Sequence, residues 1–327
     1  MTGGRRRVGL VPTVSAVGLL VLLGMAPLVV RREDWLNLGV VFFLVVALAQ
    51  SWNVIGGLAG QVNLGHAAFF GLGALVARQL WAAGTPIAAA MTAGAAVATT
   101  AGLALGLAAF RLRGAYFAIG TLALAEGLRL FVANTLSQVS TLPAAAIAGY
   151  RLGVRYYTAA GLALGTTLAV AWLAASRLGL AMEAVREDEE AAEASGVGGF
   201  QVKLAALACS TALVGLAGGV FAFYQISYYP QHPFNPTWTF DAVLITFIGG
   251  VGTIHGPVLG AVLFVLLRDY LAVRWADLHV LVFGALFVAI VLLLPGGLVE
   301  VGRRLRGRPG VAGRGRVVGR ASSGSST

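Results

Sequence analysis

Apolar runs of roughly 20 residues succeed one another along almost the whole chain and are separated by short polar turns. A run of this length is what an α-helix needs to cross the hydrocarbon core of a bilayer. Hydrophobic residues make up 58% of the chain and charged residues 11%, whereas soluble domains average about 45–50% and about 25%. So few charges cannot cover a water-exposed surface. The sequence therefore predicts an all-α, polytopic integral membrane protein and excludes a soluble enzyme, a secreted disulfide scaffold and a disordered protein.

The predicted membrane-spanning segments follow these apolar runs. The fourth segment is so rich in Ala, Gly and Thr that it should pack closely against another helix. The first is long enough to span a bilayer and lacks a clear small-residue cleavage site, so a cleaved signal peptide is not expected. The segments cover residues 8–30, 36–57, 60–81, 86–110, 115–133, 157–176, 203–228, 239–273 and 278–294.

The net charge of +10 is concentrated near the two ends of the chain. Arginines cluster at residues 5–7 and again along 303–320, next to long apolar segments. Positive clusters in that position mark the cytoplasmic side of a membrane protein, so both termini are predicted to be cytoplasmic. No basic face interleaved with aromatic residues accompanies the charge, and nucleic-acid binding is therefore not expected.

Glycines interrupt the apolar stretch 239–273 between Gly249 and Pro257. If the termini, residues 111–113 and residues 177–202 all lie in the cytoplasm, the chain must cross the membrane an even number of times. We therefore interpret 239–273 as two shortened helices, which gives about ten crossings; the alternative is one kinked helix and about nine. Broken helices occur where their backbone groups are buried in protein or line a cavity, so this stretch is a candidate path element.

Residues 177–202 form the one long hydrophilic segment inside the chain and hold six of its thirteen acidic residues. Their Ala-rich and Glu-rich composition predicts a helix outside the membrane. In this segment the tripeptide Glu-Ala-Ala at 190–192 precedes Gly196, and a glycine so placed supplies the left-handed turn that ends a helix. The spacing resembles the EAA loop of ATP-binding-cassette (ABC) importer permeases, a short cytoplasmic helix that docks on the ATPase. A solvated charged face is the alternative interpretation.

Five blocks of sequence together resemble the LivM branch of the branched-chain amino acid ABC importer permeases, the LivH/LivM family. They occur in the family's order, and the resemblance runs from about residue 36 to 300. The blocks are 53–73 (NVIGGLAGQVNLGHAAFFGLG), 112–126 (LRGAYFAIGTLALAE), 184–196 (AVREDEEAAEASG), 249–260 (GGVGTIHGPVLG) and 294–298 (LPGGL).

The resemblance implies a permease subunit of an ABC importer, without enzymatic activity, in the bacterial cytoplasmic (inner) membrane. Residues 1–300 would form one transmembrane permease domain with 177–202 as its coupling loop, and the Gly-, Ser- and Arg-rich tail 301–327 is predicted to be disordered. With a LivH-like partner permease the chain would form the path for branched-chain amino acids or a similar small polar solute. The other implied partners are LivG/LivF-like ATPases and an extracytoplasmic solute-binding protein. ATP would be bound by the ATPases, since this chain has no GxxxxGK[ST] loop and is predicted to hold no cofactor.

Polar side chains inside the spans are the candidate path residues. Gln61, Asn63 and His66 lie in an apolar stretch, where such groups must be partnered or line a wet cavity. They either tie helices together or line the path. No second His, Cys or carboxylate lies at ligand spacing from His66, so a metal is not expected. The full path set is Gln61, Asn63, His66, Glu126, Gly250 and Gly252. The coupling set implied by the resemblance is Arg186, Glu190, Ala191, Ala192 and Gly196.

Two of the acidic residues within the predicted spans, Glu126 and Asp241, allow a specific interpretation. Glu126 and Arg129 are three positions apart on one helix face, which favours a structural ion pair over a proton relay. Asp241 stands at the start of the broken stretch and is interpreted as a helix N-cap rather than a substrate ligand.

Two other functions are alternatives to the importer. A stand-alone channel or secondary transporter needs no acidic coupling loop, and Glu126, its candidate ion site, is neutralised by Arg129. A membrane enzyme is disfavoured because the sequence has no HExxH, GxSxG or paired-carboxylate site. Residues 137–146 depart from the Gly-rich loop of many relatives. The resemblance therefore leaves open which solute is carried, from branched-chain amino acids to urea or short amides.

Overall fold

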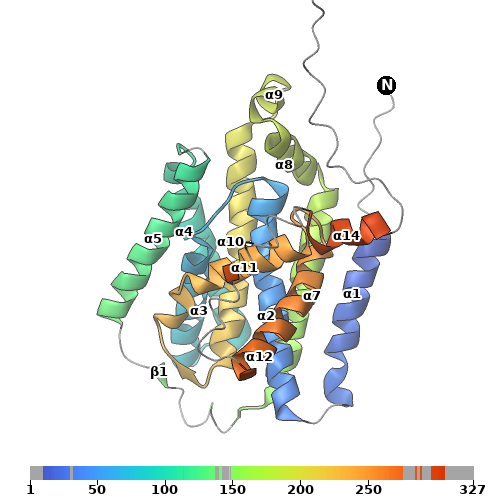
Figure 1. Cartoon of the computed structure of the whole chain (residues 1–327). Coiled ribbons are helices and arrows are strands. Elements are labelled where there is room, and N and C mark those ends of the chain that lie inside the picture. The colour runs from blue at the N-terminus through green and yellow to red at the C-terminus, as the bar shows by residue number, and fades with distance from the viewer. Residues whose placement is uncertain are drawn as a thin grey trace, which may run out of the picture.

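Helices make up nearly all of the described chain (Figure 1). The structure is a computed structural model that describes residues 10–29, 32–112, 114–136, 140–141, 147, 149–274, 284–285, 288 and 296–305. The helices are α1 (Leu10–Gly24), α2 (Glu33–Trp52), α3 (His66–Ala82), α4 (Ile87–Ala109), α5 (Ala115–Thr135), α7 (Leu152–Ala175), α8 (Arg177–Glu187), α9 (Glu189–Ala194), α10 (Gly199–Tyr224), α11 (Thr237–Gly249), α12 (Gly256–Arg274) and α14 (Gly297–Leu305). Shorter elements are η1 (Ala26–Leu28), the π-helix η2 (Asn53–Leu58), η3 (His232–Phe234) and the antiparallel strands β1 (Ser140–Thr141) and β2 (Ser227–Tyr228). The predicted all-α class is confirmed.

Five helical stretches among the described residues are long and apolar enough to cross a membrane. They are Glu33–Leu58, Ile87–Ala109, Ala115–Thr135, Leu152–Ala175 and Gly199–Tyr224. Each coincides with a predicted span, and the largest shift is at α7, which begins at Leu152 rather than residue 157. The match follows from the lack of water in lipid, which forces a spanning segment to satisfy its backbone groups internally. The predicted span 278–294, the arginines at 5–7 and the tail beyond 305 lie almost entirely outside the described residues.

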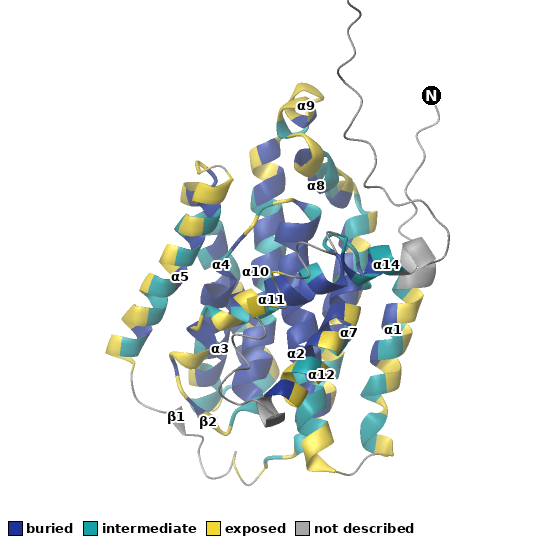
Figure 2. Ribbon diagram, viewed as in Figure 1, coloured by how far each residue is buried: buried dark blue, intermediate teal, exposed yellow. Residues whose placement is uncertain are grey.

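Helix α2 is the centre of the bundle. Its residues from Phe42 to Trp52 are all buried, and it packs against α7, α10, α11 and α12. Figure 2 shows buried residues filling the middle of the molecule, while α1 and α5 at its two edges are largely exposed. A helix that is apolar all round, as α2 is, can be buried on every side.

Helices α3, α4 and α10 approach each other through small residues, as predicted for segment 86–110. A Cβ atom placed on Gly73 would collide with the carbonyl oxygen of Gly215, and one on Gly94 would lie 2.5 Å from the carbonyl oxygen of Gly73. These backbones therefore touch directly, and the van der Waals contact of close-packed helices replaces the hydrophobic effect that is missing in lipid.

The stretch 239–273 is a broken pair of helices, which confirms that part of the sequence prediction. Helix α11 ends at Gly249, α12 begins at Gly256, and the two pack against each other. The predicted third span is only partly helical. Residues 59–65 are not in a helix, and α3 starts at His66, because glycines flank this segment and its backbone is held by side chains instead.

The two ends of the molecule differ. Helices α8 and α9 project from the upper end in Figure 1, which we call the coupling end, and β1, β2 and η3 lie at the opposite end. At this opposite end two buried arginines bind the carbonyl oxygens that close α10. Arg78 donates to Gln225 (2.9 Å) and Ile226 (2.8 Å), and Arg155 donates to Phe223 (3.0 Å). Carbonyls at a helix C-terminus carry partial negative charge, so cations stabilise them.

Candidate coupling segment and transport path

The candidate coupling segment 177–202, below called the coupling segment, contains the two short helices α8 and α9, each with a side-chain N-cap, and the first residues of α10. The hydroxyl of Ser176 accepts from the backbone N–H of Gly179 (3.2 Å) at the start of α8. The carboxylate of Asp188 accepts from Ala191 N–H (3.0 Å) at the start of α9. Helix α9 ends before Gly196, whose φ of +84° is the left-handed conformation that glycine adopts without strain. The predicted helix and its glycine stop are confirmed.

One side of the coupling segment is anchored and the other faces away from the bundle. Met182, Val185 and Ala192 are buried against the bundle. Lys203, itself only 8% exposed, forms an ion pair with Glu189 at 2.5 Å, which ties α9 to the first turns of α10. Glu190, Ala191 and Gly196 are exposed. The segment thus presents a small, acidic outer face on a rigid base.

Arg186 joins the coupling segment to the broken parts of the bundle. Its Nη1 donates to the carbonyl oxygen of Gly57, in the π-helix, at 2.5 Å. A Cβ atom on Gly252 would lie 2.6 Å from the same Nη1, and one on Gly60 would lie 2.5 Å from Arg186 Cγ. The glycines of the 53–73 and 249–260 blocks therefore make room for this arginine.

The loop between α11 and α12 is fastened to α2 at the same place. Asn53 accepts from Gly252 N–H and donates to the carbonyl oxygen of Thr253, both at 2.9 Å. Gln50 donates to the carbonyl oxygen of Ile254 at 2.7 Å. Three elements far apart in the sequence, α8, the end of α2 and the α11–α12 loop, meet in this contact, which we call the Arg186 joint. Of the predicted residues, it brings together Arg186 and Gly252.

Asn63 and His66 lie deep in the bundle and bind their neighbours. His66 Nε2 is 2.9 Å from the hydroxyl of Ser51, and Asn63 Oδ1 accepts from Gly65 N–H at 2.8 Å. Trp52 donates to the backbone carbonyl of Asn63 at 2.8 Å. These contacts correspond to the helix-tying interpretation. Asn63 Nδ2 and His66 Nδ1 are buried and have no partner among the described residues.

Gln61 and Glu126 stand apart from this cluster. Gln61 lies in the segment between η2 and α3 and is partly exposed. Glu126 accepts from Arg129 Nε through both carboxylate oxygens (3.0 and 2.9 Å), so the predicted ion pair is confirmed. Both side chains are partly exposed on α5, which lies at the edge of the bundle (Figure 1). The remaining candidate path residue, Gly250, packs against Gly296 and Val299 near the start of α14.

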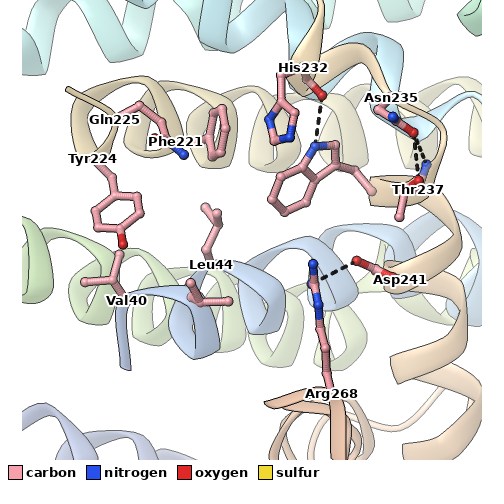
Figure 3. A pocket seen from close by; sticks show the side chains of 12 residues that line it. Val40, Leu44, Phe221, Tyr224, Gln225, His232, Asn235, Thr237, Asp241 and Arg268 are labelled. Carbon is pink, nitrogen blue, oxygen red and sulfur yellow. Dashed lines mark hydrogen bonds and ion pairs between the residues drawn. The ribbon is translucent and has the colours of Figure 1, made fainter. Parts of the chain in front are cut away.

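A cavity of about 210 Å³ lies toward the opposite end of the molecule (Figure 3). It is bounded by α2, α10, η3, α11 and α12, and Asp241 and Arg268 face each other in it at 3.4 Å. The lining residues are Val40, Val41, Leu44, Phe221, Tyr224, Gln225, His232, Asn235, Thr237, Trp238, Asp241 and Arg268.

The N-cap interpretation of Asp241 is wrong. Helix α11 starts at Thr237, and it is Asn235 whose side chain accepts from Thr237 N–H at 3.0 Å. Asp241 therefore lies one turn inside the helix, with its carboxylate directed to Arg268 (Figure 3). Sequence reasoning did not select Arg268 at all. The signal that could have found it was a pair of opposite charges on the two halves of one broken apolar stretch.

Aromatic rings form one wall of the cavity. The rings of Phe221 and Trp238 lie 5.3 Å apart edge to face, and the imidazole of His232 stacks on Phe221 at 5.9 Å. Partial burial lowers the pKa of His232, which favours the neutral ring. Among the described residues, no three His, Cys, Asp or Glu side chains are placed to hold a metal ion.

Several apolar spans, a broken helix pair and a few polar side chains buried between the spans are features of membrane transport proteins. The chain belongs to the family described as branched-chain amino acid transport system / permease component, which matches residues 35–291. It is therefore a multi-pass permease subunit of an ABC importer and not an enzyme. Such a system comprises a partner permease, ATPases and a binding protein.

The chain is similar to curated permeases from bacteria and an archaeon. It is 29% identical to the high-affinity branched-chain amino acid transport system permease protein LivM of Escherichia coli, over 88% of this chain and 75% of that protein. The LivM of Salmonella typhimurium is 28% identical over the same shares. A probable LivM of Methanocaldococcus jannaschii is 24% identical over 37% of this chain and 39% of that protein. No solved structure matches the chain.

Proposed function

We propose that this chain and a LivH-like second permease form the path by which branched-chain amino acids cross a bacterial cytoplasmic membrane. ATPases of the LivG/LivF kind bind ATP and dock on α8 and α9, so that the coupling end and both termini lie in the cytoplasm. An extracytoplasmic solute-binding protein delivers the amino acid at the opposite end. The substrate class is supported by the names of the two LivM relatives, which match over 75% of their length.

Coupling rests on the exposed face of α9. ATP binds the closed ATPase dimer better than the open one, and this difference in affinity is the free energy available to move the permease. The ATPases push on Glu190, Ala191 and Gly196. Because Ala192 and the ion pair of Lys203 with Glu189 fix α9 to the bundle, the segment moves as one body. The displacement passes to Asn53, Gly57 and Gly252 through Arg186.

The observation that carries this proposal is the position of Arg186, which donates to Gly57 in the π-helix and lies against Gly252 in the α11–α12 loop. Discontinuous helices are the elements that change shape in many transporters. A contact at their junction with the coupling segment is therefore suited to convert a push at α9 into opening or closing of the path.

The test is a pull-down of the tagged chain from detergent-solubilised membranes. Wild type is compared with Glu190→Ala and Gly196→Trp, and with Arg177→Ala, an exposed residue at the far end of α8, as the control. The wild type and the control should retain an ABC ATPase and a second permease, while the two variants lose the ATPase and keep the permease. Equal recovery of ATPase with all four chains would contradict the docking site. A clean homo-oligomer without ATPase would favour the stand-alone channel.

A further inference from the structure

The cavity at the opposite end holds two charges whose contact is incomplete. Asp241 and Arg268 meet through one pair of atoms at 3.4 Å. In the Glu126–Arg129 pair on α5, by contrast, both carboxylate oxygens accept hydrogen bonds from the guanidinium. Arg268 also lies over the ring of Phe264, 5.9 Å from its guanidinium carbon, a contact that uses no N–H donor. A guanidinium has five N–H donors and a carboxylate about four acceptor positions. Both groups therefore retain capacity for a ligand.

The side chains around this pair are apolar and aromatic. Val40 and Leu44 of α2 line one side of the cavity and Phe221 another (Figure 3). Trp238, whose ring packs on Phe221, also lines it. Small-molecule sites combine this kind of wall with a few polar groups that fix orientation. One cation, one anion and an apolar surface within about 210 Å³ match the three parts of an apolar α-amino acid: carboxylate, ammonium and hydrocarbon side chain.

We propose that this cavity is a binding site for a zwitterionic amino acid with an apolar side chain, an inference that rests on the proposed function. The ammonium group pairs with Asp241, the carboxylate pairs with Arg268, and the side chain lies against Val40, Leu44 and Trp238. The ligand inserts between the two charges and replaces their single 3.4 Å contact by two charge-assisted contacts. Each protein charge keeps an opposite partner, so neither is left buried alone.

The location of the cavity suits a path. Its residues come from both halves of the broken pair, Asp241 from α11 and Arg268 from α12, and these helices join at the loop that Asn53 and Arg186 hold. A ligand bound between the two charges therefore bridges the elements that the coupling segment moves. Arg268 is 44% exposed and Asp241 is 16% exposed, so the guanidinium is the more accessible of the two charged groups.

The experiment measures protection of a cysteine in the assembled transporter. The native cysteine is removed by Cys209→Ala, and Thr237→Cys places one thiol on the exposed rim of the cavity. The rate of alkylation by iodoacetamide is measured against increasing L-leucine, against leucinamide, which lacks the carboxylate, and against isocaproate, which lacks the ammonium group. Thr135→Cys, an exposed position at the end of α5, is the control thiol.

Leucine should slow alkylation at position 237 and leave position 135 unchanged. Half-maximal protection should require at least about tenfold more leucinamide or isocaproate than leucine, because each analogue loses one charge-assisted contact. Asp241→Asn and Arg268→Gln should each raise the leucine concentration needed for half-maximal protection by a similar factor. The double change Arg32→Gln/Asp34→Asn, at an exposed ion pair, should leave that concentration unchanged.

Two outcomes would overturn the site. Equal protection by leucine and both analogues would mean that Asp241 and Arg268 do not bind the charged groups of the ligand. Absence of protection, with Asp241→Asn and Arg268→Gln lowering only thermal stability, would make the pair a structural link between α11 and α12. The assay does not depend on ATP, so a failed pull-down of the ATPase would reject the proposed function without deciding this site.

Discussion

The side chain of Arg186 and the backbone carbonyl of Gly57 are in hydrogen-bond contact at 2.5 Å, although the two residues are 129 positions apart. The carbonyl belongs to a π-helix, in which the regular bonding of an α-helix is interrupted. A charged donor at that point satisfies a backbone group that the irregular turn leaves available. The same guanidinium lies against Gly252, so one side chain of the coupling segment contacts both discontinuities of the bundle.

Replacing Arg186 by Met should separate ATP hydrolysis from transport. Methionine keeps an unbranched chain in the space beside Gly60 but cannot donate to Gly57. Loss of a hydrogen bond from a charged group costs about 1.4 kcal/mol or more, which corresponds to about a tenfold change in an equilibrium constant. We expect the ATPase to remain bound in a pull-down, while leucine uptake into proteoliposomes per ATP hydrolysed falls about tenfold.

The control for this change is Arg177→Met, on the same helix but exposed and outside the joint. It removes the same charge from α8 and should leave uptake unchanged. If both variants lose uptake equally, the effect comes from the net charge of the segment, and the role of the Arg186 joint is wrong.

The crowding of the joint predicts a distinct effect for Gly252→Ala. A Cβ atom there would lie 2.6 Å from Arg186 Nη1 and 3.0 Å from the carbonyl oxygen of Gly57, and the backbone has a φ of +73°. Gly84→Ala is the control, because Gly84 has a φ of +94° and a Cβ atom added there would meet nothing within 4 Å. Both changes carry the left-handed strain of about 1–2 kcal/mol. The unfolding temperature of the detergent-solubilised complex should fall in both, but uptake should fall only in Gly252→Ala.

The long helices could be predicted from the sequence because hydropathy and length decide them. Span 115–133 became α5 with its start unchanged, and the glycines after Gly249 broke 239–273 as expected. The third span was predicted too long. Gln61 and Asn63 have apolar neighbours but lie between two glycines, and a window of average hydropathy does not register such a turn.

Contacts between distant segments could not be predicted in this way. Asp241 was interpreted as a cap from its place in the chain, yet it is Asn235 that accepts from the first N–H of α11, and Asp241 pairs with a residue 27 positions later. Arg78 and Arg155 bind carbonyls at the end of α10, partners that carry no side-chain signal. Hydropathy places Arg78 as a polar residue in an apolar run and Arg155 in a loop. Whether such a side chain can be buried depends on which backbone groups the fold brings near it.

The glycine at the end of α9 should be replaceable by asparagine but not by valine. Gly196 has a φ of +84°, and a Cβ atom there would meet nothing within 4 Å, so only backbone strain opposes a side chain. Asparagine tolerates the left-handed region far better than a β-branched residue does. We expect Gly196→Asn to retain the ATPase in a pull-down and Gly196→Val to lose it. Retention by both variants would show that the sharp turn is dispensable for docking.

The two buried arginines at the end of α10 should contribute more to the thermal stability of the complex than surface arginines do. Arg78 is fully buried and donates to the buried carbonyl of Ala222 and the partly buried carbonyls of Gln225 and Ile226, so Arg78→Met removes their donor. An unsatisfied buried polar group costs about 1–3 kcal/mol. Thermal unfolding of the complex should occur at a lower temperature, with Arg32→Met, at an exposed site, as the unaffected control. An unchanged unfolding temperature for Arg78→Met would mean that water or another group replaces the guanidinium.

The ion pair on α5 predicts that removing both charges is less harmful than removing one. Glu126 and Arg129 lie in the middle of an apolar helix, where a charge without its partner is costly. Glu126→Gln leaves the guanidinium alone, whereas Glu126→Gln/Arg129→Met leaves no charge. Because the pair is partly exposed, its own contribution is small, about 0–1 kcal/mol. The unfolding temperature of the complex should therefore be lowest in the single variant and close to wild type in the double variant. If instead the double variant unfolds normally but loses leucine uptake, Glu126 acts in transport and the structural role of the pair is wrong.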